Sequence, residues 1–268
     1  MSSTSGVTAS EGPEDILRRR GTAQQKSTLE TQPSTVVRSE SSKIPNTPLA
    51  ASIISFSLGA LFILGVLMFS NRGLQSGIVT WQLGFFVAAW AAFHWGEFAV
   101  TAGWNREKCS VDSFLLENGM HYHAAHSIAI LEYTLTVWLK PSLKAYPYIS
   151  AIGIALVVLG QFLRSAAMIH AARSFSHTVA WSKLPNHVLV KDGIYSWSRH
   201  PSYAGFFYWA LGTQLVLQNP ISFLGYAVVL WRFFNARIKY EERHLVRFFG
   251  QDYEDYRTQV GTKIPFIP

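Results

Sequence analysis

The sequence predicts an all-α polytopic membrane protein with about six transmembrane helices, the last two forming a C-terminal helical hairpin. Hydrophobic residues make up 49% of the 268 residues and charged residues only 15%, whereas a soluble domain carries about 25% charged residues. Long apolar stretches account for this difference. They lie at residues 49–69, 77–100, 128–139, 148–169, 203–217 and 221–234.

The segment before the first apolar stretch has a different composition. Residues 1–45 are rich in Ser, Thr, Gln, Glu and Gly and nearly free of aromatic side chains. Such a segment buries too little apolar surface to offset its chain entropy, and it is too polar for a cleaved signal peptide. We therefore expect a disordered cytosolic tail at 1–45 and a membrane domain at 46–268.

The apolar stretches differ in length. A helix needs about 20 residues to cross the hydrocarbon core, and the first, second and fourth stretches reach that length. The third reaches it only if its helix starts near His121. The last two are short and are separated by Gln218-Asn219-Pro220, a turn signal that predicts a tight helical hairpin.

The distribution of basic residues predicts the orientation. With six crossings, one set of loops contains only Arg72, Lys140 and Lys144, while most other Lys and Arg fall on the side of both termini. Basic residues collect on the cytosolic side of membrane proteins. The net charge of +7 therefore indicates topology and not a nucleic-acid partner. The single cysteine, Cys109, excludes an intrachain disulfide and fits a cytosol-facing chain.

The second stretch carries two ionisable residues, His94 and Glu97, in an otherwise apolar run. Such groups are costly at membrane depth and usually face the protein interior. One interpretation is that either residue lines a cavity or pairs with a partner such as Arg164. The alternative is an interfacial anchor beside an aromatic belt. That belt would comprise Trp90, Trp95 and Trp104.

Polar residues also interrupt the fourth stretch, at Gln161, Arg164 and His170. Gln161 and Arg164 are three positions apart and share a helix face, which we expect to face the bundle. Two interpretations stay open. Arg164 takes part in an active site, or these side chains only snorkel and hydrogen-bond within the bundle.

Three histidines, His121, His123 and His126, lie near the start of the third stretch. His121 and His123 do not share a helix face, and no further ligands occur at metal-site spacing. A structural or interfacial role is favoured, so no metal site is predicted.

The most informative loop runs from His187 to Tyr203, a polar stretch between two very apolar segments. Asp192-Gly193 predicts a turn that lets the backbone approach a ligand closely. Arg199-His200-Pro201 then begins a helix, because proline suits the first helical turn and directs the preceding residue away from helical geometry. His200 and the free N–H groups of the new helix would face a ligand. The sequence thus predicts a cytosolic cofactor-binding loop.

Residues 231–249 predict an amphipathic helix that leaves the last apolar stretch. Arg237 and Glu241 are four positions apart and share a face, with Glu242 beside them. As an exposed salt bridge the pair would contribute only tenths of a kcal/mol. Directed into one pocket, the guanidinium would bind a carboxylate and the carboxylate would accept hydrogen bonds from a ribose or an amine.

From about Gly160 onward, the chain resembles the isoprenylcysteine carboxyl methyltransferase family in its eukaryotic endoplasmic-reticulum form. Arg-His-Pro-x-Tyr alone also occurs in other membrane enzymes, but its combination with Glu241-Glu242 and the Phe-Ile ending is specific. The matching segments are 160–168, 174–177, 187–190, 193–195, 199–203, 212–214, 219–220, 231–234, 237, 241–242 and 264–267.

The resemblance implies methyl transfer from S-adenosylmethionine to the C-terminal carboxylate of a prenylated cysteine. It implies that Arg237 engages the substrate carboxylate, and that the cofactor site lies mainly within 160–268. The implied cofactor contacts are His187, Val188, Leu189, Val190, Tyr195, His200, Pro201, Ser202, Tyr203 and Glu241. Some members carry a glutamine after a Phe-x-His motif where this chain has Ala180, so that contact is absent or replaced.

The resemblance also implies a setting in the endoplasmic reticulum membrane, with the active site and both termini in the cytosol. Its partners would be membrane lipid and farnesylated or geranylgeranylated proteins, such as small GTPases and lipopeptide pheromones. It leaves room for a homodimer.

Two rival interpretations remain. One is a related methyltransferase acting on a phospholipid amine, which the guanidinium of Arg237 disfavours. The other is a channel, receptor or scaffold without enzymatic activity, which would distribute polar residues along a pore.

Overall fold

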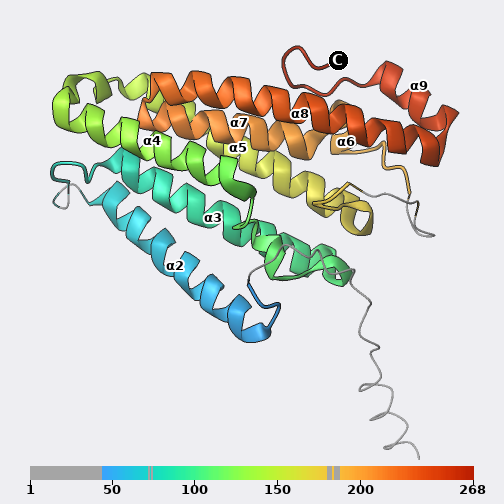
Figure 1. Ribbon diagram of the computed structural model, residues 1–268, viewed down its shortest axis with the longest axis horizontal. Coiled ribbons are helices and arrows are strands. Elements are labelled where there is room, and N and C mark those ends of the chain that lie inside the picture. Colours follow the sequence, from blue (N-terminus) through green and yellow to red (C-terminus); the bar gives the residue numbers. More distant parts are fainter. Residues whose placement is uncertain (1–43, 72, 74, 180–182, 184–187) are drawn as a thin grey trace, which may run out of the picture. The chain divides into compact units, whose positions relative to one another are not determined.

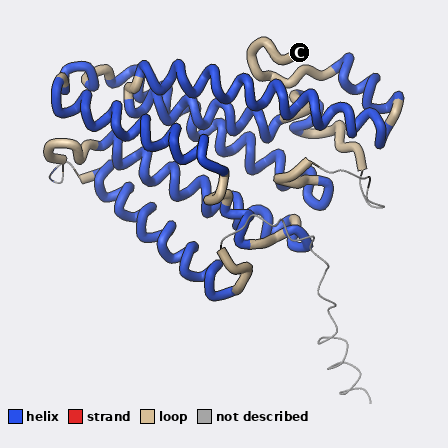
Figure 2. Tube along the Cα trace, viewed as in Figure 1, coloured by secondary structure: helices blue, strands red, loops and turns tan. Residues whose placement is uncertain are grey.

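The computed structural model describes residues 44–71, 73, 75–179, 183 and 188–268. Regular structure within these ranges is helical, apart from one isolated bridge between Ser76 and Val79 (Figure 2). The tail expected at 1–45 falls almost entirely outside these ranges, as do His187 and Ala180, so the tail remains a prediction.

Six long helices coincide with the six apolar stretches (Figure 1). The third begins two residues before His121 and so has the length that its apolar part lacked. They are α2 (Pro48–Ser70), α3 (Trp81–Trp104), α4 (Gly119–Leu139), α5 (Pro147–Ala171), α7 (Pro201–Leu217) and α8 (Pro220–Phe249).

Among the described residues, three helical segments are long and apolar enough to cross a membrane: Pro48–Ser70, Trp81–Trp104 and Pro147–Ser174. The shorter helices α6 (Ile194–Trp197) and α9 (Gln251–Gln259) lie near one end of the bundle (Figure 1). A membrane-spanning, helical architecture is therefore supported, while six crossings remain an expectation.

The helix starts follow from local sequence. Thr47 and Thr80 cap α2 and α3 with their hydroxyl groups, which accept backbone N–H groups three residues on, as N-cap residues do. Proline occupies the first position of α2, α5, α7 and α8, where its missing N–H has no cost. The elements thus begin where the sequence provides a cap or a proline.

The predicted hairpin is confirmed as a pair of helices, α7 and α8, joined through Gln218 and Asn219. Gln218 adopts a left-handed backbone conformation (φ 53°), which reverses the chain before Pro220 begins α8. However, α8 is a single helix of 30 residues. The predicted last apolar stretch and the amphipathic helix after it are one continuous element.

Close contact between α5 and α7 determines where the polar residues of these helices meet. A Cβ atom at Gly160 would lie 2.6 Å from the carbonyl oxygen of Gly205, and one at Gly205 would lie 2.7 Å from the Arg164 nitrogen. Only glycine permits such an approach of two backbones. Arg164 on α5 is thereby placed against the first turn of α7.

Candidate functional site

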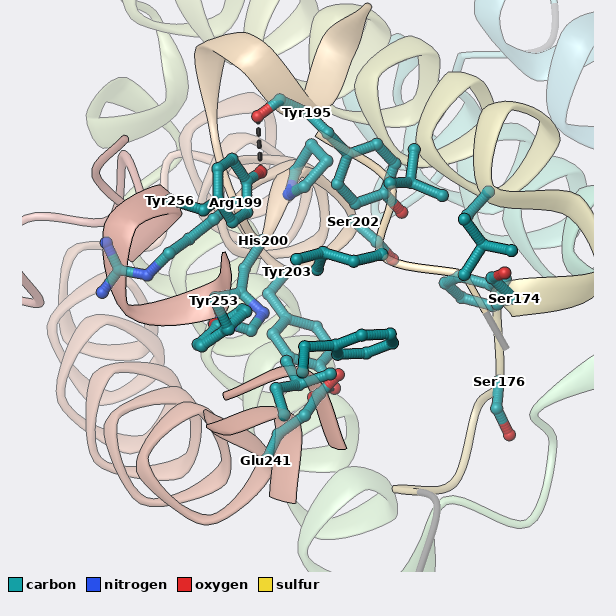
Figure 3. A pocket seen from close by; sticks show the side chains of 18 residues that line it. Ser174, Ser176, Tyr195, Arg199, His200, Ser202, Tyr203, Glu241, Tyr253 and Tyr256 are labelled. Atoms are coloured by element: carbon teal, nitrogen blue, oxygen red, sulfur yellow. Dashed lines mark hydrogen bonds between the residues drawn. The ribbon is translucent and has the colours of Figure 1, made fainter. Parts of the chain in front are cut away.

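A pocket opens at the end of the bundle where α7 begins (Figure 3). Its walls come from the end of α5 and the chain after it, the 188–195 segment, the first turn of α7, and α8 with α9. The lining residues are Ala171, Ser174, Phe175, Ser176, Val188, Leu189, Val190, Tyr195, Arg199, His200, Pro201, Ser202, Tyr203, Glu241, Leu245, Phe249, Tyr253 and Tyr256.

The first turn of α7 forms one wall. Pro201 stands at its first position and His200 at its N-cap, so the sequence itself starts the helix at the pocket. The rings of His200 and Tyr203 are parallel, with centroids 5.4 Å apart. Pro201 has no N–H group, and the Tyr203 N–H donates to the His200 carbonyl at 3.1 Å. Among the described residues, the Ser202 N–H is therefore the first-turn backbone donor that has no acceptor, and this wall offers that donor to an anionic group.

The 188–195 segment forms a second, largely apolar wall. Gly193 has a positive φ of 54°, and a Cβ atom there would lie 2.5 Å from the His170 ring. His170 also contacts Asp192 at 3.2 Å, and this hydrogen bond lowers the pKa of Asp192. The turn predicted at Asp192-Gly193 therefore exists and is held against α5.

Tyr195 connects this wall to its surroundings. Its hydroxyl donates to the Ala167 carbonyl at 3.2 Å, and its own carbonyl accepts the Tyr256 hydroxyl at 2.6 Å, the bond drawn in Figure 3. Helices α5 and α9 thus hold Tyr195 from two sides.

Arg237 and Glu241 on α8 are joined through Tyr203. The Tyr203 hydroxyl donates to Glu241 Oε2 at 2.5 Å and accepts from Arg237 Nε at 2.8 Å. Arg237 Nη2 donates to the His177 carbonyl at 2.5 Å. Nη1 has no hydrogen bond among the described residues. The two charges share one side of the helix, as the spacing predicts, but a phenol lies between them.

A buried ion pair lies beside the pocket. Glu97 is 1% exposed and accepts two hydrogen bonds from Arg164, one of them at 2.7 Å from Nη2. His177 Nε2 lies 2.9 Å from the same carboxylate, and Arg164 Nη1 donates to Ser202 Oγ at 2.9 Å. The interpretation that Glu97 pairs with Arg164 is confirmed.

One histidine of α3 takes structural contacts. His94 is held between the Phe114 carbonyl and the Tyr122 hydroxyl, both at 2.7 Å, and so does not face the pocket. No group of three or more potential metal ligands is found in the part of the chain that the structure describes.

Most of the expected cofactor contacts meet in the pocket. Of the ten, only His187 is missing, because it lies outside the described residues. Arg237 and Arg164 do not line the pocket but contact its lining residues Tyr203 and Ser202.

Several lining residues were not expected from sequence. Phe249 follows Glu241 and Leu245 at helical spacing, a signal that places Leu245 beside Glu241 from the sequence and could have identified Phe249 as well. Tyr253 and Tyr256 belong to α9, and nothing local in the sequence relates that helix to the loop before α7.

The fold defines a helical membrane protein with a pocket of mixed polar and apolar lining at one end of its bundle. Residues 152–247 match the model of the isoprenylcysteine carboxyl methyltransferase family.

The relatives extend this match over most of the chain. A protein-S-isoprenylcysteine O-methyltransferase of Saccharomyces cerevisiae is 48% identical over 77% of this chain and 89% of its own. The Homo sapiens protein of that name is 41% identical over 78% and 72%. A solved structure of a eukaryotic intramembrane Ras methyltransferase is 38% identical, with a TM-score of 0.77 over 81% of this chain and 76% of that one. The chain belongs to the isoprenylcysteine carboxyl methyltransferase family.

Proposed function

We propose that the protein transfers a methyl group from S-adenosylmethionine to the C-terminal carboxylate of a prenylated cysteine. The observation that carries the proposal is the Arg237–Tyr203–Glu241 arrangement at the pocket. In this arrangement a guanidinium whose Nη1 has no partner in the part of the chain that the structure describes lies next to a site that suits a polar cofactor. A guanidinium binds carboxylates through paired, charge-assisted hydrogen bonds.

The residues present fit S-adenosylmethionine. Val188, Leu189 and Val190 offer an apolar surface for the adenine ring. Glu241 would accept hydrogen bonds from the ribose hydroxyls or the amino group. His200 and the first turn of α7 would bind the methionine carboxylate, because helix N-termini favour anions.

The reaction requires little acid–base chemistry from the protein. A carboxylate is ionised at pH 7 and is already a nucleophile, which is consistent with a pocket built for binding. When bound, S-adenosylmethionine supplies a methyl group on a sulfonium. Arg237 orients the acceptor carboxylate, Tyr203 holds Arg237, and the aromatic walls exclude water.

The proposed setting is the endoplasmic reticulum membrane, with six crossings and the pocket facing the cytosol. The farnesyl or geranylgeranyl chain would stay in lipid or between helices while the cofactor enters from the aqueous side. Prenylated small GTPases and lipopeptide pheromones are the proposed substrate classes.

The decisive test measures base-labile methyl incorporation from labelled S-adenosylmethionine into N-acetyl-S-farnesylcysteine, using membranes that contain the protein. Arg237→Ala should reduce turnover by about 100-fold or more, the scale of a lost charge-assisted contact in the transition state, while cofactor binding persists.

Lys239→Ala is the matched control, because Lys239 lies two residues away on the same helix and is exposed. Equal activities of Arg237→Ala and wild type would refute the role of Arg237. Cofactor binding without any methyl ester would refute the acceptor, and phospholipid amines would be tested next.

A further inference from the structure

The chain after α9 packs against the helices that carry the pocket. Residues 260–268 return beside α8 (Figure 1), and Ile264 and Ile267 are only 3% and 5% exposed. The Ser198 hydroxyl donates to the Thr262 carbonyl at 2.8 Å. The Arg199 N–H donates to the Gly261 carbonyl at 3.2 Å. The segment is therefore bound directly to the two residues that precede His200.

Arg199 forms hydrogen bonds with both ends of this segment. Its side chain is 4% exposed, with Nη1 donating to the Val260 carbonyl at 2.6 Å and Nη2 to the Pro268 oxygen at 2.5 Å. The third nitrogen, Nε, donates to Glu242 Oε1 at 2.5 Å. Each nitrogen of this buried guanidinium thus has a partner, and these three hydrogen bonds hold its position, because breaking any of them would leave a buried polar group unpaired.

Glu242 connects Arg199 to His200, which lines the pocket. The same oxygen, Oε1, lies 3.1 Å from His200 Nε2, although Glu242 itself does not line the pocket. One carboxylate oxygen thus holds Arg199 and His200 together. Nε2 is the ring atom engaged by the carboxylate, and Nδ1 has no hydrogen bond among the described residues.

We infer that residues 260–268, acting through Arg199 and Glu242, position His200 for the anionic end of the methyl donor. Glu242 and Arg199 are positioning residues. The C-terminal segment both stabilises the fold and helps to form the S-adenosylmethionine site. This inference rests on the proposed function, since it assigns His200 to the carboxylate of S-adenosylmethionine.

The arrangement predicts that substitutions at Glu242 and Arg199 weaken binding of S-adenosylmethionine and not of the prenylated substrate. The neutral amide of Glu242→Gln makes weaker hydrogen bonds to Arg199 and His200 than the carboxylate does, and Arg199→Lys cannot contact three partners at once. Each substitution should raise the KM and the dissociation constant for S-adenosylmethionine about tenfold, the scale of one charge-assisted hydrogen bond. The KM for N-acetyl-S-farnesylcysteine should stay near the wild-type value.

The experiment measures both KM values, and binding of labelled S-adenosylmethionine, for wild type, Glu242→Gln, Arg199→Lys and a chain lacking residues 264–268. Asp252→Asn is the matched control, since this exposed α9 carboxylate makes no contact with His200. Melting temperatures identify variants that do not fold, and the two point variants keep the test valid if the truncated chain fails.

Weaker binding of S-adenosylmethionine, with an unchanged KM for N-acetyl-S-farnesylcysteine, supports the inference. Equal changes in both KM values, or a lower melting temperature with unchanged donor affinity, would overturn it and leave a purely structural role. If wild type binds S-adenosylmethionine but yields no ester, the proposed reaction fails. The binding measurement still decides the role of Glu242 in that case.

Discussion

Polar side chains gather at both ends of the α7–α8 hairpin. At the turn they pair with helix-terminal groups, and at the opposite end they border a pocket. At the turn, Lys144 Nζ donates to the carbonyls of Leu217 and Gln218, each at 2.9 Å, and to Asn219 Oδ1 at 2.7 Å. These partners are helix-terminal groups that would otherwise be unpaired.

The first backbone N–H groups of α8 are likewise paired with a charged side chain. The Glu132 carboxylate accepts the N–H groups of Ile221 and Ser222 at 2.9 Å and 2.6 Å. At the other end of the hairpin, His200, Tyr203 and Glu241 border a pocket. A charged residue near a membrane therefore indicates a ligand site only when its partners leave room for a ligand.

Replacing Lys144 should produce the largest stability effect of the turn end. Lys144→Ala leaves two buried carbonyls and an amide oxygen without their donor, which should cost about 2–4 kcal/mol. Thermal unfolding in detergent should show a clearly lower melting temperature, with both KM values unchanged. A raised KM for either substrate would show that the turn end is coupled to the pocket.

Replacing Glu241 should have the opposite signature. Glu241→Ala removes a carboxylate that accepts the Tyr203 hydroxyl and lines the pocket. S-adenosylmethionine should bind about tenfold more weakly, a loss of about 1.4 kcal/mol, while the melting temperature changes little. Unchanged cofactor affinity would remove Glu241 from the proposed site.

Acid should destabilise the pocket end of the hairpin through Glu242, which lies beyond the apolar part of α8. Burial alone would raise its pKa, but hydrogen bonds from His200 and Arg199 outweigh burial and lower the pKa from 4.5 to about 2. Because the folded-state value is the lower one, this stabilisation is complete above pH 4.5 and is lost as the pH falls toward 2.

The melting temperature should therefore decline across that range, and Glu242→Gln should flatten the decline. An identical acid profile for both proteins would show that other carboxylates dominate.

The smallest effect is expected from the N-terminal tail. Deleting residues 2–44 removes a segment too polar to bury a core, so methyl transfer should stay within about twofold of wild type, less than 0.5 kcal/mol. Comparing kcat/KM for the full and shortened chains tests this. A large loss would assign the tail a part in catalysis or assembly.

The helices, the hairpin and half of the residues that line the pocket could be predicted from the sequence. Apolar stretches mark the helices because burying polar backbone and side chains in lipid is costly. The 188–190 and 200–203 segments are short and contiguous, so a single motif identifies residues that also lie together in space. The pairing of Glu97 with Arg164 was one of two open interpretations, and the structure selected it.

Only the tertiary structure decided how the charged groups are connected. It placed Tyr203 between Arg237 and Glu241, and residues 260–268 around Arg199. Helical periodicity relates residues three or four positions apart. Contacts between residues 34 to 69 positions apart depend on how whole helices pack, which no local pattern encodes.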